Sequence, residues 1–361
     1  MTPVDKVALY EDKRFLDALR KVAPGTPLRE GLSYIIQGGT GGLIVLSSSP
    51  KVRALSEGGV KINSLFQPTL LYELAKMDGA IFVDKDVTKI ISANTFLVPD
   101  ESIYSEETGT RHRAGQRFAQ QTGELVIAIS QRRSTVTLYV GTIKHVMDSI
   151  ATLLNKAVQA LQTLEKYKAT LDRLLVELSV RELEDLVTIY DVARTVQHTE
   201  MVLRIVKEIE YYIVELGIEG RLLEMQLREF EESINEGLTV VRDYYRDKEI
   251  RNEKEVFGRL SKFPPKELLN LGNISNALGF GLNISAVDEY LAPRGYRILA
   301  KTHRVPRPVI ENLVNTFSNL RAIIQAPREK LTAVEGMGEV RAEKLKEGLK
   351  LLRNQLIFDL H

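Results

Sequence analysis

The stretch that decides the fold of the first part of the chain reads LLYELAKMDGAIFV and spans Leu70–Val83. Its apolar residues recur at helical spacing as far as Met77. The Asp78-Gly79 pair that follows is typical of a tight turn, and an uninterrupted apolar run comes directly after it. The stretch therefore predicts a helix, a turn and a short buried strand in direct succession.

Three further apolar runs of the same kind surround this stretch. They are Leu43–Leu46, Leu125–Ile129 and Val136–Val140, each bounded by turn residues. Short runs of this kind predict strands. Helix-period segments such as Gln116–Thr122 lie between them. Interleaved strands and helices predict a mixed sheet covered by helices, and we assign this domain to residues 1–147.

The pattern changes after residue 147. Glycine and proline become rare, and leucines keep helical spacing against a face of Glu and Lys as far as Phe263. Pro264-Pro265 is expected to end this helical region, because proline stops helices. The sequence thus predicts a central helical spine over residues 148–290 and a third domain of short helices over residues 291–361. The predicted fold class is α+β for the first domain and all-α for the rest.

The composition excludes several classes of protein. The 361 residues are 44% hydrophobic and 27% charged with a net charge of +1, so no global field directs the chain to nucleic acid or membrane. No apolar run reaches membrane-spanning length, and Met1–Leu9 lacks the apolar core of a signal peptide, so we expect a cytoplasmic protein without a membrane partner. The lack of cysteine excludes disulfides and thiolate metal sites. The C-terminal tail alone has an excess of positive charge, since Arg294–His361 carries 13 Lys and Arg against 7 Asp and Glu.

The segment Gly109–Arg113 is a candidate phosphate-binding motif. Glycine permits a close approach of the backbone to a ligand, and arginines match phosphate oxygens in pairs. We expect a helix from Ala114 onwards, whose free N–H groups would face an anion. The competing interpretation is a solvated basic turn that caps a helix, and for an isolated Arg-His-Arg it is the commoner one.

Two other sites could complete such a pocket. Asp78 stands where a predicted helix meets a predicted strand, and its carboxylate could bind Mg²⁺ or Mn²⁺ or accept a proton from a hydroxyl. Ser130 and Arg133 follow the end of a predicted strand and could add phosphate contacts. The alternatives are a plain Asp-Gly turn and ordinary surface charge.

Two further patterns are not interpreted as sites. We reject a P-loop at Gly38–Gly42, because the Gly-Lys-Ser/Thr ending is missing and a strand follows where a helix should. His145, His198 and His303 lack the spacing of metal ligands, and we interpret them as structural.

The stretch Val334–Leu345 matches a helix–hairpin–helix motif. Gly336 and Gly338 would turn the chain so that backbone N–H groups at a helix N-terminus face a DNA phosphate, and Arg341 and Lys344 would add charge. Such contacts read no base edges, so binding would be independent of base sequence and sensitive to salt. The alternative is an ordinary interaction hairpin.

Several longer blocks give these motifs a context. They are Leu71–Ala80, Ala93–Asp100, Glu107–Arg113, Gln121–Gly123, Thr163–Lys168, Val214–Gly217 and the hairpin at Gly336. In this order they resemble the DNA-integrity scanning proteins, a family of bacterial diadenylate cyclases. The resemblance covers the whole chain and is far more specific than any single tripeptide.

The resemblance implies a reaction, an assembly and a role for each motif. Members of the family join two ATP molecules into cyclic di-AMP and two pyrophosphates, in homo-octamers in which two cyclase domains face each other. Their C-terminal helix–hairpin–helix domain is expected to bind branched DNA such as Holliday junctions and to lower synthesis, which would bring the protein to the nucleoid.

Individual residues inherit roles from the resemblance. Asp78 would bind Mg²⁺ or Mn²⁺ and help to deprotonate the attacking hydroxyl. The catalytic set would be Asp78, Arg111, His112 and Arg113. The ATP-binding set would be Gly79, Leu97, Thr110, Arg111, His112, Arg113, Ala114, Ser130 and Arg133. The DNA-binding set would be Gly336, Gly338, Arg341 and Lys344.

The chain departs from the family pattern at one position. Arg-His-Arg is usually followed by Thr or Ser, and here Ala114 follows. A lost hydroxyl would remove one phosphate hydrogen bond, worth about 1 kcal/mol, so ATP should bind more weakly than in relatives. The departure leaves open a non-catalytic protein that senses ATP and binds DNA. A DNA-repair nuclease subunit is a third interpretation, but the sequence lacks a paired acidic cluster for metal-dependent cleavage.

Overall fold

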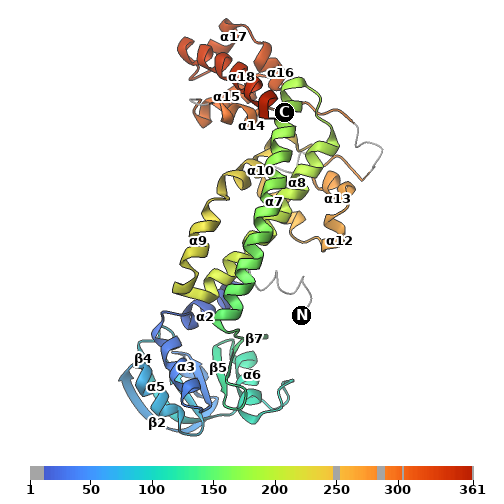
Figure 1. The fold of residues 1–361 in the computed structure, drawn as a ribbon. Coiled ribbons are helices and arrows are strands. Elements are labelled where there is room, and N and C mark those ends of the chain that lie inside the picture. Colours follow the sequence, from blue (N-terminus) through green and yellow to red (C-terminus); the bar gives the residue numbers. More distant parts are fainter. Residues whose placement is uncertain (1–11, 247–252, 283–288, 303–304, 360–361) are drawn as a thin grey trace. The chain divides into compact units, whose positions relative to one another are not determined.

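The chain divides into two units, and each is described by itself. The computed structural model describes residues 12–246, 253–282, 289–302 and 305–359, so the predictions for Met1–Leu9 and for His303 lie outside the described residues. The first unit comprises Met1–Gln159 and Glu208–Met225, and the second comprises Ala160–Lys207 and Gln226–His361. Two long helices, α7 (Ile150–Glu184) and α8 (Ile189–Leu216), contribute residues to both units (Figure 1). The domain limits at residues 147 and 290 stay predictions.

The first unit is built on a seven-stranded mixed sheet. Its strand order is β2-β4-β3-β1-β5-β6-β7, in which β1 and β3 are parallel and all other neighbours are antiparallel. The strands are β1 (Gly42–Leu46), β2 (Ser56–Leu65), β3 (Ala80–Val83), β4 (Lys89–Leu97), β5 (Leu125–Ser130), β6 (Thr135–Val140) and β7 (Ile143–Val146). The mixed sheet predicted from the sequence is confirmed.

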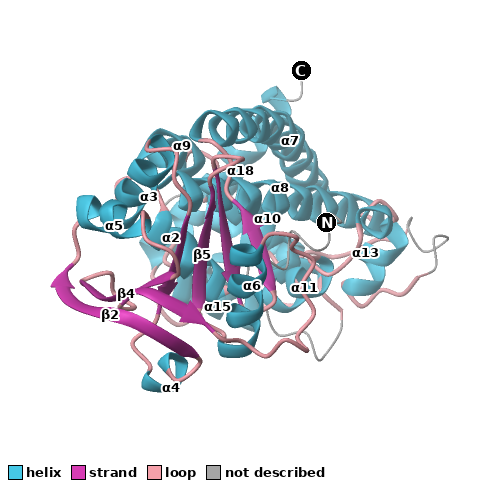
Figure 2. Ribbon diagram, turned by 90° about the horizontal axis from the view of Figure 1, so that it is seen from below, coloured by secondary structure: helices cyan, strands magenta, loops and turns pink. Residues whose placement is uncertain are grey.

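Helices cover both faces of this sheet, which is why β1 and β3 are buried along their whole length (Figure 2). The helices of this unit are α2 (Lys13–Val22), α3 (Pro27–Gln37), α4 (Pro50–Arg53), α5 (Pro68–Ala75) and α6 (Thr110–Thr122). On one face, Gly42 of β1 lies beside Ile35 of α3 and Ala75 of α5. On the other face, Phe118 of α6 packs into a cluster with Val45 of β1.

The sequence did not predict three of the strands, β2, β4 and β7, and the physical reason differs for each. Most residues of β2 are exposed and two are glycines, so no apolar alternation marks it. The alternation of β4 is broken by a bulge, in which Asn94 takes a φ of 52°. β7 has only four residues, too few for a period to show. By contrast, the strands predicted at Leu43, Ala80, Leu125 and Val136 are all present.

The second unit is helical in its described part. After α7 and α8 come η1 (Gly217–Gly220), α9 (Arg221–Arg228), α10 (Glu231–Tyr244), α11 (Glu253–Leu260), α12 (Pro265–Leu268), α13 (Leu271–Ala277), α14 (Tyr296–Lys301), α15 (Arg307–Thr316), α16 (Leu320–Gln325), α17 (Arg328–Thr332) and α18 (Glu339–Asp359), of which η1 and most of α9 belong to the first unit. The predicted long helices are confirmed. None of the helices in the described residues is long and apolar enough to cross a membrane.

The prediction that Pro264-Pro265 ends the helical region is wrong. α11 does stop before it, but Pro264 is the N-cap of α12 and Pro265 is its first residue. Proline is well suited to the first turn of a helix, because the N–H that it lacks has no intrahelical acceptor there. The two prolines therefore start a helix instead of closing the region.

A buried ion cluster holds α14 in place within the second unit. The side chain of Arg297 is 1% exposed and is paired with Glu182 of α7 and, at 2.6 Å, with Glu236 of α10. Asp243 accepts hydrogen bonds from the backbone N–H groups of Gly295, Tyr296 and Arg297. Burial raises the pKa of Glu182 to about 6 although Arg297 opposes this. Each buried charge therefore has a partner, as burial requires.

Candidate active site

One edge of the sheet collects most of the residues that the sequence singled out. The parallel strands β1 and β3 start at this edge. β5 and β4 run the other way and end there, since Ile129 pairs with Gly42 and Thr95 pairs with Ala80. Four predicted site residues follow from this register, namely Asp78 and Gly79 before β3, Leu97 at the end of β4 and Ser130 at the end of β5.

Gly79 fixes the turn that carries Asp78. Its φ is 85°, and a Cβ at this position would lie 2.9 Å from both the backbone N and the backbone O of Thr95. Real side chains do not approach a backbone so closely, so only glycine lets the turn rest on the bulge of β4. The Asp78 side chain is exposed, and its carboxylate has no hydrogen bond or ion pair to any residue that the structure describes. It is therefore free to meet a ligand.

Arg111 reaches the same edge from α6. Its Nη1 lies 2.3 Å from the point that a Cβ on Gly41 would occupy, and the carbonyl oxygen of Ile129 lies 3.0 Å from that point. Gly41 thus leaves the space that the guanidinium needs. The Gly38–Gly42 run is not a P-loop, since β1 follows it, but it still borders this edge. Sequence reasoning missed that role, and its only signal was the glycine run itself.

The helix expected from Ala114 starts four residues earlier. α6 begins at Thr110, Gly109 is its N-cap, and the N–H of Arg113 donates the first helical hydrogen bond, to the carbonyl of Gly109 at 2.9 Å. Thr110, Arg111 and His112 therefore form the first turn itself instead of a loop before it. Their N–H groups have no intrahelical acceptor, which makes this end of the helix attractive to an anion.

A polar cluster surrounds His112. Burial lowers the pKa of His112, the nearby Glu107 opposes this, and the charges of Arg111, Arg133 and Lys144 lower it further. The lowered pKa favours the neutral imidazole, which has one N–H to donate. Arg133, whose charge contributes to this lower pKa, lies in the turn between β5 and β6. The backbone N–H of Arg133 donates to Ser130 Oγ at 3.3 Å and closes that turn.

The remaining predicted ATP-site residues differ in their surroundings. Arg113 donates from Nε to the carbonyl of Glu107 at 3.1 Å, so its guanidinium braces the preceding segment. Leu97 packs against the core cluster of the sheet. Ala114 is half-buried in α6, and Thr110 is exposed.

The arrangement around Asp78 suits a metal that arrives with its substrate. The described residues contain no group of three or more His, Cys, Asp or Glu that could hold an ion. Mg²⁺ is commonly held by one or two carboxylates together with substrate phosphates. A single exposed carboxylate at the edge of the sheet that Arg111 of α6 also reaches fits that mode and does not fit an all-protein cage.

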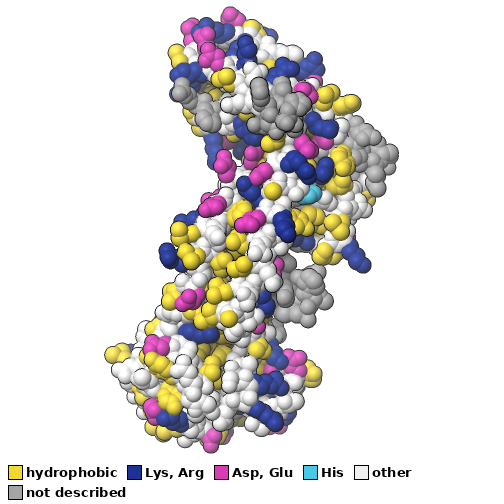
Figure 3. All heavy atoms as spheres, viewed as in Figure 1, with side chains coloured by type: hydrophobic (Ala, Val, Ile, Leu, Met, Phe, Trp, Pro, Cys, Tyr) yellow, Lys and Arg dark blue, Asp and Glu magenta, His cyan; other side chains and the backbone are white. Residues whose placement is uncertain are grey.

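The predicted DNA-binding residues belong to the second unit. Gly336 has a φ of 81° and turns the chain between α17 and α18, and the turn packs through Met337 into the core of the C-terminal helices. Arg341 Nη1 donates to the carbonyl of Gly336 at 2.6 Å, so this arginine closes the turn itself. Lys344 is exposed, one turn further along α18. In Figure 3 the helices at the top of the view carry Lys and Arg interspersed with Asp and Glu.

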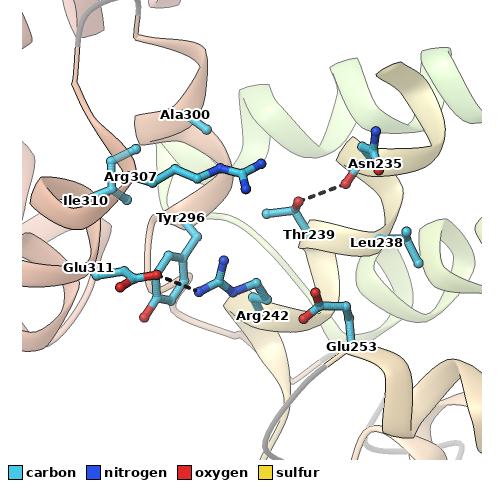
Figure 4. A pocket seen from close by; sticks show the side chains of 10 residues that line it. All are labelled: Asn235, Leu238, Thr239, Arg242, Glu253, Tyr296, Ala300, Arg307, Ile310 and Glu311. Carbon is cyan, nitrogen blue, oxygen red and sulfur yellow. Dashed lines mark hydrogen bonds and ion pairs between the residues drawn. The ribbon is translucent and has the colours of Figure 1, made fainter. Parts of the chain in front are cut away.

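A separate hollow of about 270 Å³ lies within the second unit. Figure 4 shows Arg242 of α10 turned toward Glu311 of α15, with Nη2 3.5 Å from Oε1, and its guanidinium carbon lies 4.4 Å from the ring centre of Tyr296. Arg307 and Glu253 supply the other charges of the lining. Two arginines and two glutamates leave no net charge for a ligand, and the Arg242–Glu311 pair joins α10 to α15.

The mixed sheet with its helices is the part of the chain that a family model assigns to the nucleotide-binding domains of the diadenylate cyclase class. A family model described as the DisA bacterial checkpoint controller nucleotide-binding domain matches residues 29–143. A second, described as the linker region of the same controller, matches residues 147–287. The chain belongs to the family of the DNA integrity scanning protein DisA.

Two relatives and one solved structure illustrate the range of similarity. The DNA integrity scanning protein DisA of Carboxydothermus hydrogenoformans is 50% identical over 97% of this chain and 100% of that protein. The protein of the same name from Clostridium botulinum is 47% identical over 97% of this chain and 99% of that protein. The crystal structure of DacA from Staphylococcus aureus is 21% identical, covers 40% of this chain and 89% of that chain, and gives a TM-score of 0.29. The predicted membership of this cyclase family is confirmed by the first two.

Proposed function

We propose that this edge of the sheet is one half of the site at which two ATP molecules become cyclic di-AMP. The main support is that Asp78, Arg111 and Ser130, which are distant in the sequence, belong to segments that meet at one edge. Gly79 and Leu97 would line the adenosine. The ATP phosphates would be held by Thr110, Arg111, His112, Arg113, Ser130 and Arg133. Ala114 would lie beside them.

The proposed chemistry is two in-line displacements. The 3′-hydroxyl of each ATP attacks the α-phosphorus of the other, one P–O bond forms, and the bond to the leaving pyrophosphate breaks. Asp78 accepts the proton released by the hydroxyl. Arg111, the neutral His112 and the free N–H groups of α6 stabilise the charge on the phosphates, since phosphoryl transfer depends on positioning and electrostatics.

A metal ion fits this proposal as a companion of ATP. Mg²⁺ or Mn²⁺ would supply charge neutralisation at the phosphates, with Asp78 as its protein ligand. The remaining ligands would be phosphate oxygens and water, which agrees with the isolated carboxylate.

The second half of the site would come from a facing subunit of a homo-octamer. Among the described residues of this edge, one chain supplies the first turn of α6 and the exposed carboxylate of Asp78, which would suffice for one ATP. Two such edges must face each other for two reciprocal attacks. Mass photometry of the full chain with and without ATP tests this assembly, and a monomer that is fully active would contradict it.

The hairpin of α17 and α18 is proposed as a helix–hairpin–helix that binds branched DNA such as Holliday junctions and lowers cyclase activity. Gly336 and Gly338 precede the free N–H groups at the start of α18, where a DNA phosphate can be bound. Arg341 is exposed and donates to Gly336 from Nη1, so its other N–H groups and the exposed Lys344 can pair with a phosphate.

Turnover decides between the cyclase and a protein that only senses ATP and binds DNA. The full chain is incubated with ATP and either Mg²⁺ or Mn²⁺, and cyclic di-AMP is measured by mass spectrometry. We expect product from the wild type and none from Asp78→Asn, which keeps the size of the side chain but removes its charge. An oligomer that binds ATP and forms no product with either metal would defeat the proposal and favour the sensor.

A further inference from the structure

In the segment before α6, the side chain of Glu107 makes two contacts with the sheet. Its Oε1 accepts a hydrogen bond from the hydroxyl of Tyr139 at 2.8 Å and is paired with Lys144 Nζ, also at 2.8 Å. The side chain is only 16% exposed. Burial by itself would raise the pKa of Glu107, but the hydrogen bonds from Lys144 and Tyr139 lower it on balance. The carboxylate is therefore ionised and doubly bound.

The same residue is tied to α6 through its backbone. Arg113 donates from Nε to the carbonyl of Glu107 at 3.1 Å and from Nη2 to the carbonyl of Thr108 at 3.5 Å. Arg113 belongs to the first turns of the helix, so Glu107 joins that turn to β6 and β7. A displacement of Glu107 is expected to displace the start of α6 as well.

Strand β7, which carries Lys144, is itself anchored to α8. The neighbour of Lys144 on β7, His145, has Nε2 3.0 Å from Oε1 of Glu215 on α8, whose side chain is 1% exposed. The other oxygen of Glu215, Oε2, is buried without a hydrogen-bond partner in the described residues, so the hydrogen bond of this carboxylate to His145 matters the more, beside the nearby charge of Arg29. Successive residues of a strand point to opposite faces, so β7 is held from one face while it holds Glu107 on the other.

We propose that Glu107 is a positioning residue of the cyclase: it sets the first turn of α6, with Thr110, Arg111 and His112, at the distance that the ATP phosphates require. It has no place among the phosphate contacts itself. The inference rests on the proposed role of Gly109–Arg113 in phosphate binding. A displacement of about 1 Å at such a site can cost on the order of a hundredfold in rate, so a bound carboxylate at this point has large leverage.

The test compares Glu107→Gln with Glu106→Gln. Both changes remove one charge at nearly constant size, and both residues pair with Lys144, at 2.8 Å and 2.9 Å. Only Glu107 also bonds Tyr139 and only Glu107 is largely buried, since the Glu106 side chain is 55% exposed. We expect Glu107→Gln to raise the KM for ATP about tenfold or more, with a smaller loss in kcat, and Glu106→Gln to change KM less than about twofold.

A second measurement separates positioning from general destabilisation. The charge of Glu107 opposes the lowering of the pKa of His112, so Glu107→Gln should lower that pKa further in an NMR titration, and Glu106→Gln should not. If Glu107→Gln does not fold, Tyr139→Phe removes one of its two side-chain bonds and should raise KM in the same direction by less.

A third variant shows which of the two proposals fails. Arg111→Ala removes a proposed phosphate ligand, and ATP binding is measured for it alongside Glu107→Gln. If Arg111→Ala loses ATP while Glu107→Gln keeps the wild-type KM and kcat, the positioning role is refuted and the site stands. If Arg111→Ala binds ATP like the wild type, the proposed phosphate site itself is refuted.

Discussion

Replacing Gly79 with alanine should damage both the fold of the first unit and its activity. The left-handed φ of 85° costs a residue with a Cβ about 1–2 kcal/mol. The new Cβ would also lie 2.9 Å from two backbone atoms of Thr95, and overpacking of this kind costs about 1–3 kcal/mol. The sum is a loss of roughly 2–5 kcal/mol. Because the turn would lift from β4, Asp78 should move and kcat should fall.

Hydrogen exchange of the amides of β3 in the full chain measures this loss, because it reports the opening free energy of that part of the sheet. The matched control is Gly123→Ala. Gly123 also has a left-handed φ, of 73°, but nothing lies within 4 Å of a Cβ there, so only the conformational cost of about 1–2 kcal/mol applies. If the two variants lose the same free energy, the contact with Thr95 does not constrain the turn and the reasoning is refuted.

Four further predictions concern the two units separately. Ala114→Thr should tighten ATP binding in calorimetry by about 1 kcal/mol, roughly fivefold. Equal ATP affinities of the two proteins would contradict the idea that the missing hydroxyl weakens binding. The pKa of His112 is lowered on folding, so the stability of the first unit should be level above pH 6.5 and fall as the pH drops through the folded pKa; urea titrations of His112→Gln should lack this fall. Lys344→Ala should reduce the salt slope of DNA binding by about 1, whereas Arg341→Ala should also loosen the hairpin and lower its protection in hydrogen exchange. Arg297→Ala should cost the second unit about 3–5 kcal/mol in chemical unfolding, since it strands the buried Glu182, and a loss below 1 kcal/mol would speak against the cluster.

The fold was predictable where burial alone decides the residue type. β1, β3, β5 and β6 are buried between helices, so their apolar runs stand out in the sequence. β2 and β4 were not, because exposed positions and a bulge remove the alternation that marks a strand. Likewise the pair Pro264-Pro265 has opposite meanings inside a helix and at its start, and local sequence does not distinguish them.

The sequence singled out residues that the fold brings to one edge of the sheet, but it did not predict their geometry, and their roles stay predictions. Asp78 and Arg111 stand out by residue type and by resemblance. That Arg113 braces a loop while Arg111 faces Gly41 depends on where α6 begins, and the expected start at Ala114 was four residues late. Glu107 gave no signal of its own, because its importance lies in partners on β6 and β7 that are more than thirty positions away.

The contact between Gly41 and Arg111 has a consequence for substitutions at position 41. With Nη1 only 2.3 Å from where a methyl group would stand, any other residue at position 41 must displace the guanidinium. Because Nη1 is the far end of a flexible side chain, Arg111 could swing aside at little cost to the fold. A side chain at position 41 should therefore change where the guanidinium lies at this edge of the sheet more than it changes the stability of the first unit.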